Sequence, residues 1–115
     1  MERQKLEPTE TYKVGDSVYN MRGSVGNLCA LEDKFNLCMG DVLLGMEKFK
    51  ISQLADAYLC LTEGDAPNKA DLQEAIVNNG YGDMRGMLYT FILLCLLPQG
   101  QREEAQKKLK PLAKS

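Results

Sequence analysis

The sequence contains no histidine among its 115 residues. Without an imidazole, this chain alone excludes catalytic mechanisms and metal sites that depend on histidine as a base or ligand. It also lacks a long apolar run, because the longest, Phe91–Leu97, has seven residues, whereas a membrane-spanning helix needs about 20. The first residues, Met1–Lys5, are polar and lead into no apolar segment of the kind found in secretory signals. We therefore expect a cytoplasmic protein that does not act at a membrane.

An excess of basic charge is also missing. The 14 basic and 16 acidic residues leave a net charge of −2, whereas nucleic-acid-binding domains usually carry a basic excess or stripe. The best case for such binding is the C-terminal segment with Lys107, Lys108 and Lys110, where salt-dependent affinity would be the signature. We do not expect a nucleic-acid partner. The length and the hydrophobic content of 44% indicate a single globular domain with one modest core.

The four cysteines form no Cys-x-x-Cys pair, so neither a zinc site nor a redox dithiol is indicated. Each is flanked by apolar residues, and a reduced cysteine behaves as a small hydrophobic side chain. We therefore expect core filling by all four, with a metal site or a disulfide as the less favoured alternatives. They are Cys29, Cys38, Cys60 and Cys95.

Three other features of the sequence contain residue types found in reactive or binding sites. Glu32 and Asp33 are adjacent, so on a helix they point about 100° apart and do not form a catalytic pair. Glu63 and Asp65 flank a glycine but lack the pattern of a calcium loop. The segment 23–26 lacks the lysine of a phosphate-binding loop, so a tight turn from strand to helix is the better interpretation. We predict no catalytic residue, no metal ligand and no cofactor.

The N-terminal part favours a short β-hairpin that follows a flexible arm over residues 1–10. Strand-forming residues in 11–14 and 17–22 flank Gly15 and Asp16, a two-residue turn signal. Glycine in the first turn position suits a type II′ turn. Because an isolated hairpin is marginally stable in water, it must pack on the residues that follow.

The rest of the domain, which we place at residues 11–97, reads as about five helices, so the expected fold is mainly α. Ser24 and Asn36 fit the start and the left-handed end of a first helix, and Asn68 and Gly80 fit those of the fourth. Asp41 and Ser52 are candidate caps of the second and third helices. We expect a loop at residues 62–69. The fifth helix is expected at 83–97. Residues 98–115 form a charged C-terminal helix or tail.

The fifth helix is apolar around its whole circumference, which is typical of a helix that is central to its fold or covered by a partner. Methionine suits surfaces that adapt to several partner sequences. We infer a partner-binding groove or a self-association face, so a homo-oligomer stays open. The predicted partner-binding residues form one stripe of this helix: Met84, Met87, Leu88, Phe91 and Ile92.

Residues 12–97 resemble the small phage tail assembly chaperones of the gene transfer agent type. In that family a strand ends with a basic residue, a Ser/Thr-apolar-Gly step opens a helix, and the helix carries Leu-Glu and a nearby Phe. Later segments also match, with a helix opening at Ile51–Leu54, a break at Gly64, and a stretch from Lys69 that closes at Gly80. The residues that match the first pattern are Arg22, Ser24, Val25, Gly26, Leu28, Leu31, Glu32 and Phe35.

The resemblance implies a non-enzymatic protein of the host cytoplasm that binds the tape measure protein during phage or prophage tail assembly. Tail-tube subunits would be a further partner. A groove lined by Met, Leu and Phe suits a long amphipathic helix without strict sequence demand. The residues leave open another helical interaction module, such as an adaptor or an immunity-type protein. A small enzyme is the weakest alternative, and it would need a pocket with clustered carboxylates or a perturbed cysteine.

Overall fold

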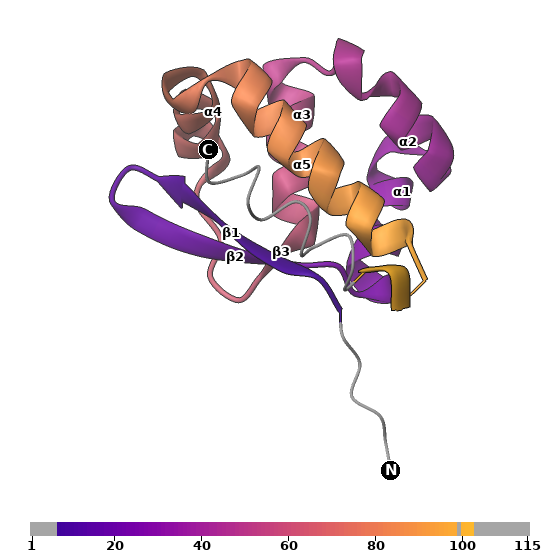
Figure 1. Ribbon diagram of the computed structural model, residues 1–115. Helices are drawn as coiled ribbons and strands as arrows, with labels where there is room; N and C mark the ends of the chain where they lie inside the picture. Colours follow the sequence, from indigo (N-terminus) through magenta and orange to yellow (C-terminus); the bar gives the residue numbers. More distant parts are fainter. Residues whose placement is uncertain (1–6, 99, 103–115) are drawn as a thin grey trace.

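The computed structural model describes residues 7–98 and 100–102. Over these residues the chain forms a three-stranded antiparallel sheet, five α-helices and a single-turn 3₁₀ helix, so the expected class is confirmed. In Figure 1 the sheet lies below the helices, and α5 crosses in front of α3. The elements are β1 (Thr9–Val14), β2 (Ser17–Arg22), α1 (Val25–Phe35), α2 (Met39–Gly45), η1 (Met46–Lys48), α3 (Ile51–Leu61), β3 (Thr62–Glu63), α4 (Lys69–Asn79) and α5 (Tyr81–Leu96).

The predicted hairpin is present, with Val14 paired to Ser17 across the turn. Gly15 has a φ of +64°, the value that the first turn position of a type II′ hairpin requires. β1 begins at Thr9, two residues earlier than predicted, and Pro8 before it is buried. The part of the predicted arm that covers residues 1–6 lies outside the described residues.

The expected loop at 62–69 is wrong at its first two residues, because Thr62 and Glu63 form β3 against β2. The side-chain amide of Asn27 stabilises this junction by donating to the carbonyl oxygens of Arg22, at 2.9 Å, and Leu61, at 3.3 Å. It also lies 3.2 Å from Oε2 of Glu63. A strand of two residues has no pattern of its own, so only this tertiary pairing defines it.

Several helix ends lie at the predicted caps. The hydroxyl of Ser24 accepts a hydrogen bond of 3.1 Å from the backbone N–H of Asn27. Asn36 has the left-handed φ and ψ of 56° and 44° at the end of α1. The side chain of Asn68 accepts from two backbone N–H groups at the start of α4, and Gly80 ends that helix with a φ of 104°.

Two predicted caps are wrong. α2 begins at Met39 rather than at Asp41, and its first N–H is bound by the carboxylate of Glu32 at 2.9 Å. α3 begins at Ile51, so Ser52 lies inside the helix rather than at its cap. At the start of α3 the backbone N–H of Lys50 donates to Oε1 of Gln53 at 2.8 Å, so both helices begin before the residue that was predicted to cap them.

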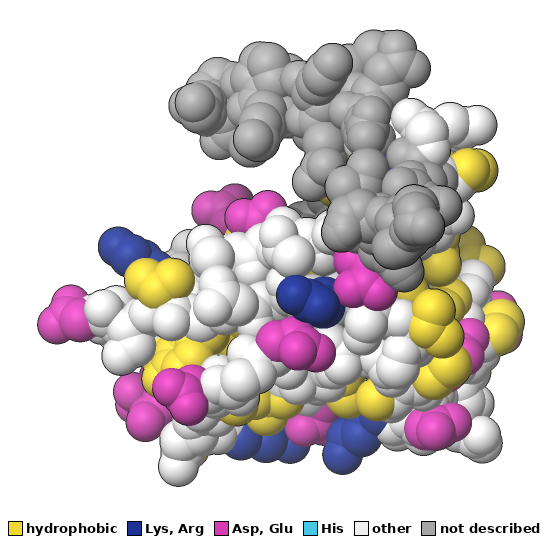
Figure 2. Space-filling view, turned by 90° about the horizontal axis from the view of Figure 1, so that it is seen from below, with side chains coloured by type: hydrophobic (Ala, Val, Ile, Leu, Met, Phe, Trp, Pro, Cys, Tyr) yellow, Lys and Arg dark blue, Asp and Glu magenta, His cyan; other side chains and the backbone are white. Residues whose placement is uncertain are grey.

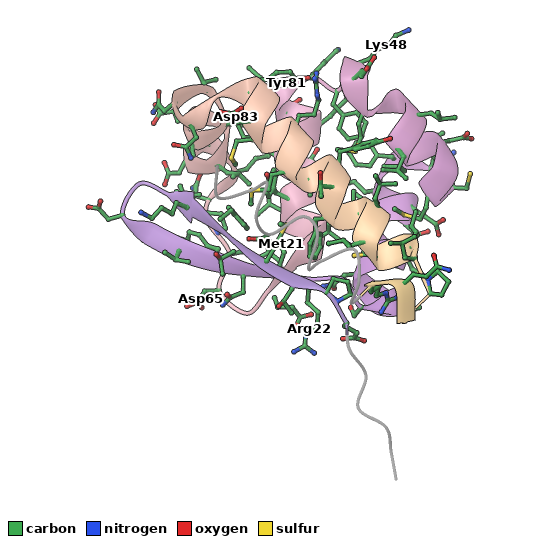
Figure 3. The ribbon with its side chains drawn as sticks, viewed as in Figure 1. Met21, Arg22, Lys48, Asp65, Tyr81 and Asp83 are labelled. Carbon is green, nitrogen blue, oxygen red and sulfur yellow. The ribbon has the colours of Figure 1, made fainter. Side chains whose placement is uncertain are left out.

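The core lies between the sheet and the helices, and Tyr58 of α3 is fully buried in it. The Tyr58 hydroxyl donates to the carbonyl oxygen of Met84 at 2.7 Å, which joins α3 to α5. The rings of Tyr12 and Tyr58 lie with their centroids 4.9 Å apart, which joins the sheet to α3. Met21 of β2, labelled in Figure 3, is also fully buried and belongs to the same core. The sheet and α5 therefore share one core.

Gly23 marks the turn from β2 into α1. Its N–H donates to the carbonyl oxygen of Pro8 at 2.9 Å, and a Cβ at this position would overlap Sγ of Cys95. The predicted tight turn at 23–26 is therefore present, and it holds the C-terminal part of α5 against the hairpin. Within the described ranges, no helix combines the length and the apolar character needed to cross a membrane.

Candidate functional site

The stripe that was predicted to bind a partner lies on the inner face of α5. Met84, Leu88, Phe91 and Ile92 belong to the core and are at most 5% exposed, and Met87 is half-buried against them. In this folded state the four buried side chains are not accessible to a partner. Their role in partner binding stays a prediction, while their role in packing is now clear.

The opposite side of α5 carries a second apolar stripe, which we call the outer stripe: Tyr89, Leu93 and Leu96. Their spacing of four and three residues places them on one helix face. Each is more than 40% exposed, at 41%, 41% and 44%. Periodicity finds both stripes in the sequence but does not show which one faces inward. The accessible apolar surface of α5 is therefore the outer stripe.

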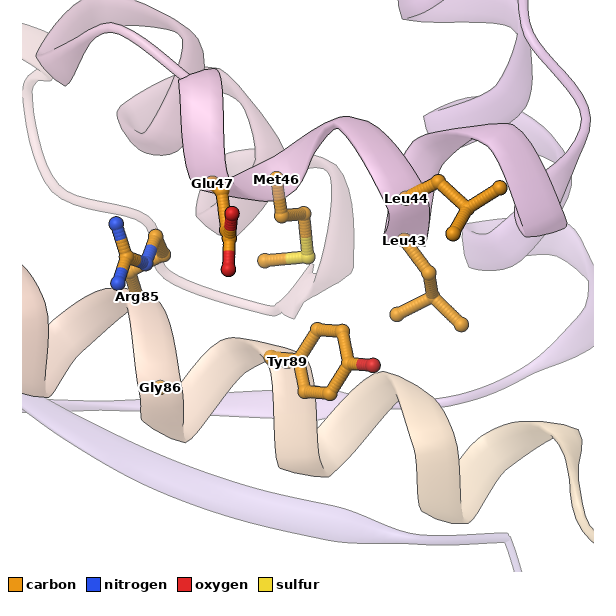
Figure 4. A pocket seen from close by; sticks show the side chains of 7 residues that line it. All are labelled: Leu43, Leu44, Met46, Glu47, Arg85, Gly86 and Tyr89. Atoms are coloured by element: carbon orange, nitrogen blue, oxygen red, sulfur yellow. The ribbon is translucent and has the colours of Figure 1, made fainter.

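Beside the outer stripe lies a groove of about 470 Å³ between α2 and η1 on one side and α5 on the other (Figure 4). We call it the α2–α5 groove. Its most unusual residue is Leu44, which is 83% exposed although it lies in a helix. Two exposed apolar residues, Leu44 and Tyr89, line this concavity, and an apolar concavity is typical of an interaction site. The lining residues are Leu43, Leu44, Met46, Glu47, Arg85, Gly86 and Tyr89.

Charge is confined to one end of the α2–α5 groove. Glu47 and Arg85 lie together at this end, away from Leu43 and Leu44 (Figure 4). The guanidinium carbon of Arg85 lies 5.4 Å from the centroid of the Tyr81 ring, a cation–π contact that orients it. One acid and one base on otherwise apolar walls suit the packing of a side-chain stripe rather than acid–base chemistry.

The acidic residues Glu32, Asp33, Glu63 and Asp65 do not converge on one site. Glu32 binds the N–H of Met39, and Glu63 binds Asn27, so both have structural partners. Asp33 and Asp65 are exposed. Over the residues that the structure describes, no group of three or more cysteine, aspartate or glutamate side chains is placed to hold a metal ion.

The cysteines divide into two groups. Burial raises the pKa of Cys95 to about 11, and it also raises the pKa of Cys60, which is half-buried. Cys29 and Cys38 are exposed, so the expectation of core filling is wrong for these two. Apolar neighbours in the sequence do not determine which side of a helix a residue occupies. All four thiols are free.

On the face that Figure 2 shows, acidic and basic side chains are interspersed with apolar ones. This view shows no broad surface of one charge. Comparison of the chain with protein-family models, with curated proteins and with solved structures gave no significant match. The α2–α5 groove, together with the outer stripe, is therefore the candidate site on physical grounds.

Proposed function

We propose that this protein is a non-enzymatic phage tail assembly chaperone that binds the tape measure protein before the tail tube forms around it. The observation that carries the proposal is the exposed apolar surface of the α2–α5 groove and the outer stripe. The resemblance of residues 12–97 to this class of chaperone, through the Ser24–Phe35 segment above all, supplies the biological setting.

The physical requirements of such a chaperone agree with this surface. A tape measure protein is a long amphipathic helix, whose apolar side aggregates until it is covered. A groove with leucine and tyrosine walls covers a helical stripe through packing, and packing tolerates changes of sequence along the partner. The charged residues at one end of the groove, Glu47 and Arg85, leave the apolar part free of charge.

A second candidate function uses the same groove. An adaptor or immunity-type protein would also present an apolar concavity, but it would bind one defined partner and would have no phage genes beside it. The neighbouring genes separate the two functions without any experiment on the protein. Tail genes beside this one support the chaperone, whereas their absence supports the adaptor.

The direct test is co-expression with a tape measure protein, taken from the neighbouring genes if they encode one. We expect the two to co-purify and the tape measure protein to move from the insoluble to the soluble fraction. The matched control is the same co-expression with Leu44→Glu, which charges the groove at a residue that is 83% exposed. If wild type never co-purifies, and the tape measure protein is equally soluble alone, the proposed function is wrong.

A further inference from the structure

We propose that the C-terminal segment of this same chain, residues 103–115, packs on the outer stripe of α5, a contact within the free chain that does not depend on the proposed function. A new helical turn begins directly after α5, over residues 100–102. In this turn the backbone N–H groups of Gln101 and Arg102 donate to the carbonyl oxygen of Pro98, at 2.9 and 3.0 Å. Two helices joined by so short a connection are antiparallel neighbours.

Arg102 ties the new turn to the end of α5, and Figure 1 shows the two side by side, with the turn in yellow. The Nε atom of Arg102 donates to the carbonyl oxygen of Leu97 at 2.9 Å, and Nη2 donates to that of Cys95 at 3.0 Å. The last carbonyl oxygens of a helix have no partner within it, so Arg102 caps α5. Residue 103 therefore starts close to Leu96, at the C-terminal end of the outer stripe.

The C-terminal segment carries apolar residues that suit one face of a helix. Its only large apolar residues are Leu109 and Leu112, and Ala105 lies four residues before Leu109. Ala105 and Leu109 share one helix face, and Pro111 ends such a helix at or before Lys110, which places Leu112 just past its end. The lysines of the segment fall on the other sides of this helix and remain in water.

The length of the segment matches the length of the outer stripe. Because a helix rises about 1.5 Å per residue, Leu109 lies about 10 Å beyond Arg102. Tyr89 lies the same number of residues back along α5 from Leu96. In an antiparallel arrangement Leu109 therefore reaches Tyr89, and the small side chain of Ala105 falls between the two ends of the stripe, where it lets the helices approach.

Charge and covalent attachment favour this segment over a second copy of the chain. The segment contains four lysines and two glutamates, whereas residues 1–102 contain 10 basic and 14 acidic residues. The segment is therefore attracted to its own domain, while two such domains repel each other. Direct attachment also gives the segment an effective concentration on the order of millimolar, which a second copy in dilute solution lacks.

The contact has a consequence for any partner of this surface. It covers Tyr89, Leu93 and Leu96 but leaves Leu44, which is 83% exposed on α2, open. A helix that binds the outer stripe must therefore first displace the C-terminal segment.

The test uses the absence of tryptophan from the chain, because a single introduced tryptophan then reports only on its own surroundings. We expect Leu109→Trp to emit at shorter wavelength than Lys108→Trp and to be quenched several-fold less by acrylamide, since only position 109 faces α5. Lys108→Trp, at the adjacent position, is the matched control. Equal emission and equal quenching at the two positions would overturn the proposal.

A charge on the outer stripe identifies the surface that protects the tryptophan. Leu93→Glu, combined with Leu109→Trp, should raise quenching to the level of Lys108→Trp. Val77→Glu on α4, at a residue 57% exposed, should leave quenching unchanged. Circular dichroism checks that each double variant folds, and Leu96→Glu takes the place of Leu93→Glu if the latter unfolds. Protection that no stripe variant removes would place the segment elsewhere and overturn the proposal.

The dependence on protein concentration checks the other occupant of the stripe. A contact within one chain does not depend on concentration, so quenching of Leu109→Trp should stay constant on dilution. Protection that is lost on dilution would assign the stripe to a second copy and overturn the proposal. These measurements contain no tape measure protein, so their outcome leaves the proposed function to its own co-expression test.

Discussion

The inner and outer faces of α5 have a similar apolar composition, but only the inner face is buried in the core. The inner face, with Leu88, Phe91 and Ile92, is buried in the core, whereas the outer face leaves Leu93 and Leu96 more than 40% exposed. Both faces are apolar, so the composition of the helix does not show which face packs in the core and which face is free to bind a partner. The difference comes from the neighbours: α3 and α4 pack on α5 and its inner face lies in the core, whereas more than 40% of each side chain of the outer stripe stays exposed. Substitutions on the two faces should therefore have opposite consequences.

The largest expected effect is that of Phe91→Asp on the inner face. Phe91 is 3% exposed, and a carboxylate there would be buried without a partner. We expect a loss of several kcal/mol in the free energy of unfolding, enough to unfold the domain. Urea denaturation followed by circular dichroism measures it. Leu93→Asp, two residues along on the outer face, replaces a side chain that is 41% exposed and should cost only about 1–2 kcal/mol. Equal effects would contradict the comparison.

The second effect is a loss of stability at alkaline pH through Cys95 on the inner face. Burial raises the pKa of Cys95 from its ordinary 9.0 to about 11 in the folded protein. Between these values the unfolded chain loses the proton while the folded chain keeps it, so the free energy of unfolding falls as pH rises. The total fall is about 3 kcal/mol, and most of it lies between pH 9 and pH 11. Denaturation at pH 8 and pH 11 should show a smaller fall for Cys95→Ala. Identical falls would exclude Cys95 as the source.

A smaller effect is expected from Tyr58→Phe, which removes a single hydroxyl behind α5. The carbonyl oxygen of Met84 would lose its hydrogen bond from the Tyr58 hydroxyl, which is buried. We expect a cost of about 1–3 kcal/mol in the free energy of unfolding, with partner binding unchanged. A matched control is Tyr89→Phe on the outer stripe, where the hydroxyl is accessible to water and its loss should change stability by less than about 0.5 kcal/mol. A destabilised Tyr89→Phe would indicate that the outer stripe also supports the fold.

The smallest effect on stability should come from Leu96→Ser on the outer stripe. Leu96 is 44% exposed, so its replacement removes about half of the area that a fully buried leucine would lose. We expect a loss of about 1 kcal/mol in the free energy of unfolding together with weaker binding to the proposed partner. The same denaturation assay and a binding titration measure both. A large loss of stability with normal binding would reverse the roles assigned to the two faces.

Local rules predicted much of the fold. The turn at Gly15 and the caps at Ser24, Asn36 and Asn68 follow from conformational preferences that act within a few residues, and these predictions are confirmed. β3 could not be predicted, because two residues become a strand only through pairing with β2. Conformational preferences therefore predict structures that depend on residues close in the sequence, but not those that depend on distant pairing.

Only part of the candidate site could be predicted from the sequence. The apolar character of the fifth helix was visible, and so was its excess over what a small core needs. The exposed side could not be chosen, because residues such as Phe91 and Leu93 are equally apolar and differ only in what packs on them. Leu44 was placed on a helix, but its exposure depends on how α2 lies beside α5.

The contact between Gly23 and Cys95 has a consequence for how this fold can diversify. The sulfur atom fills the volume that any side chain at position 23 would need. The two positions should therefore covary: an alanine at 23 calls for a glycine or alanine at 95, and a bulkier residue at 95 forbids any change at 23. Gly23→Ala alone should be poorly tolerated, and the double variant with Cys95→Ala should recover most of the loss.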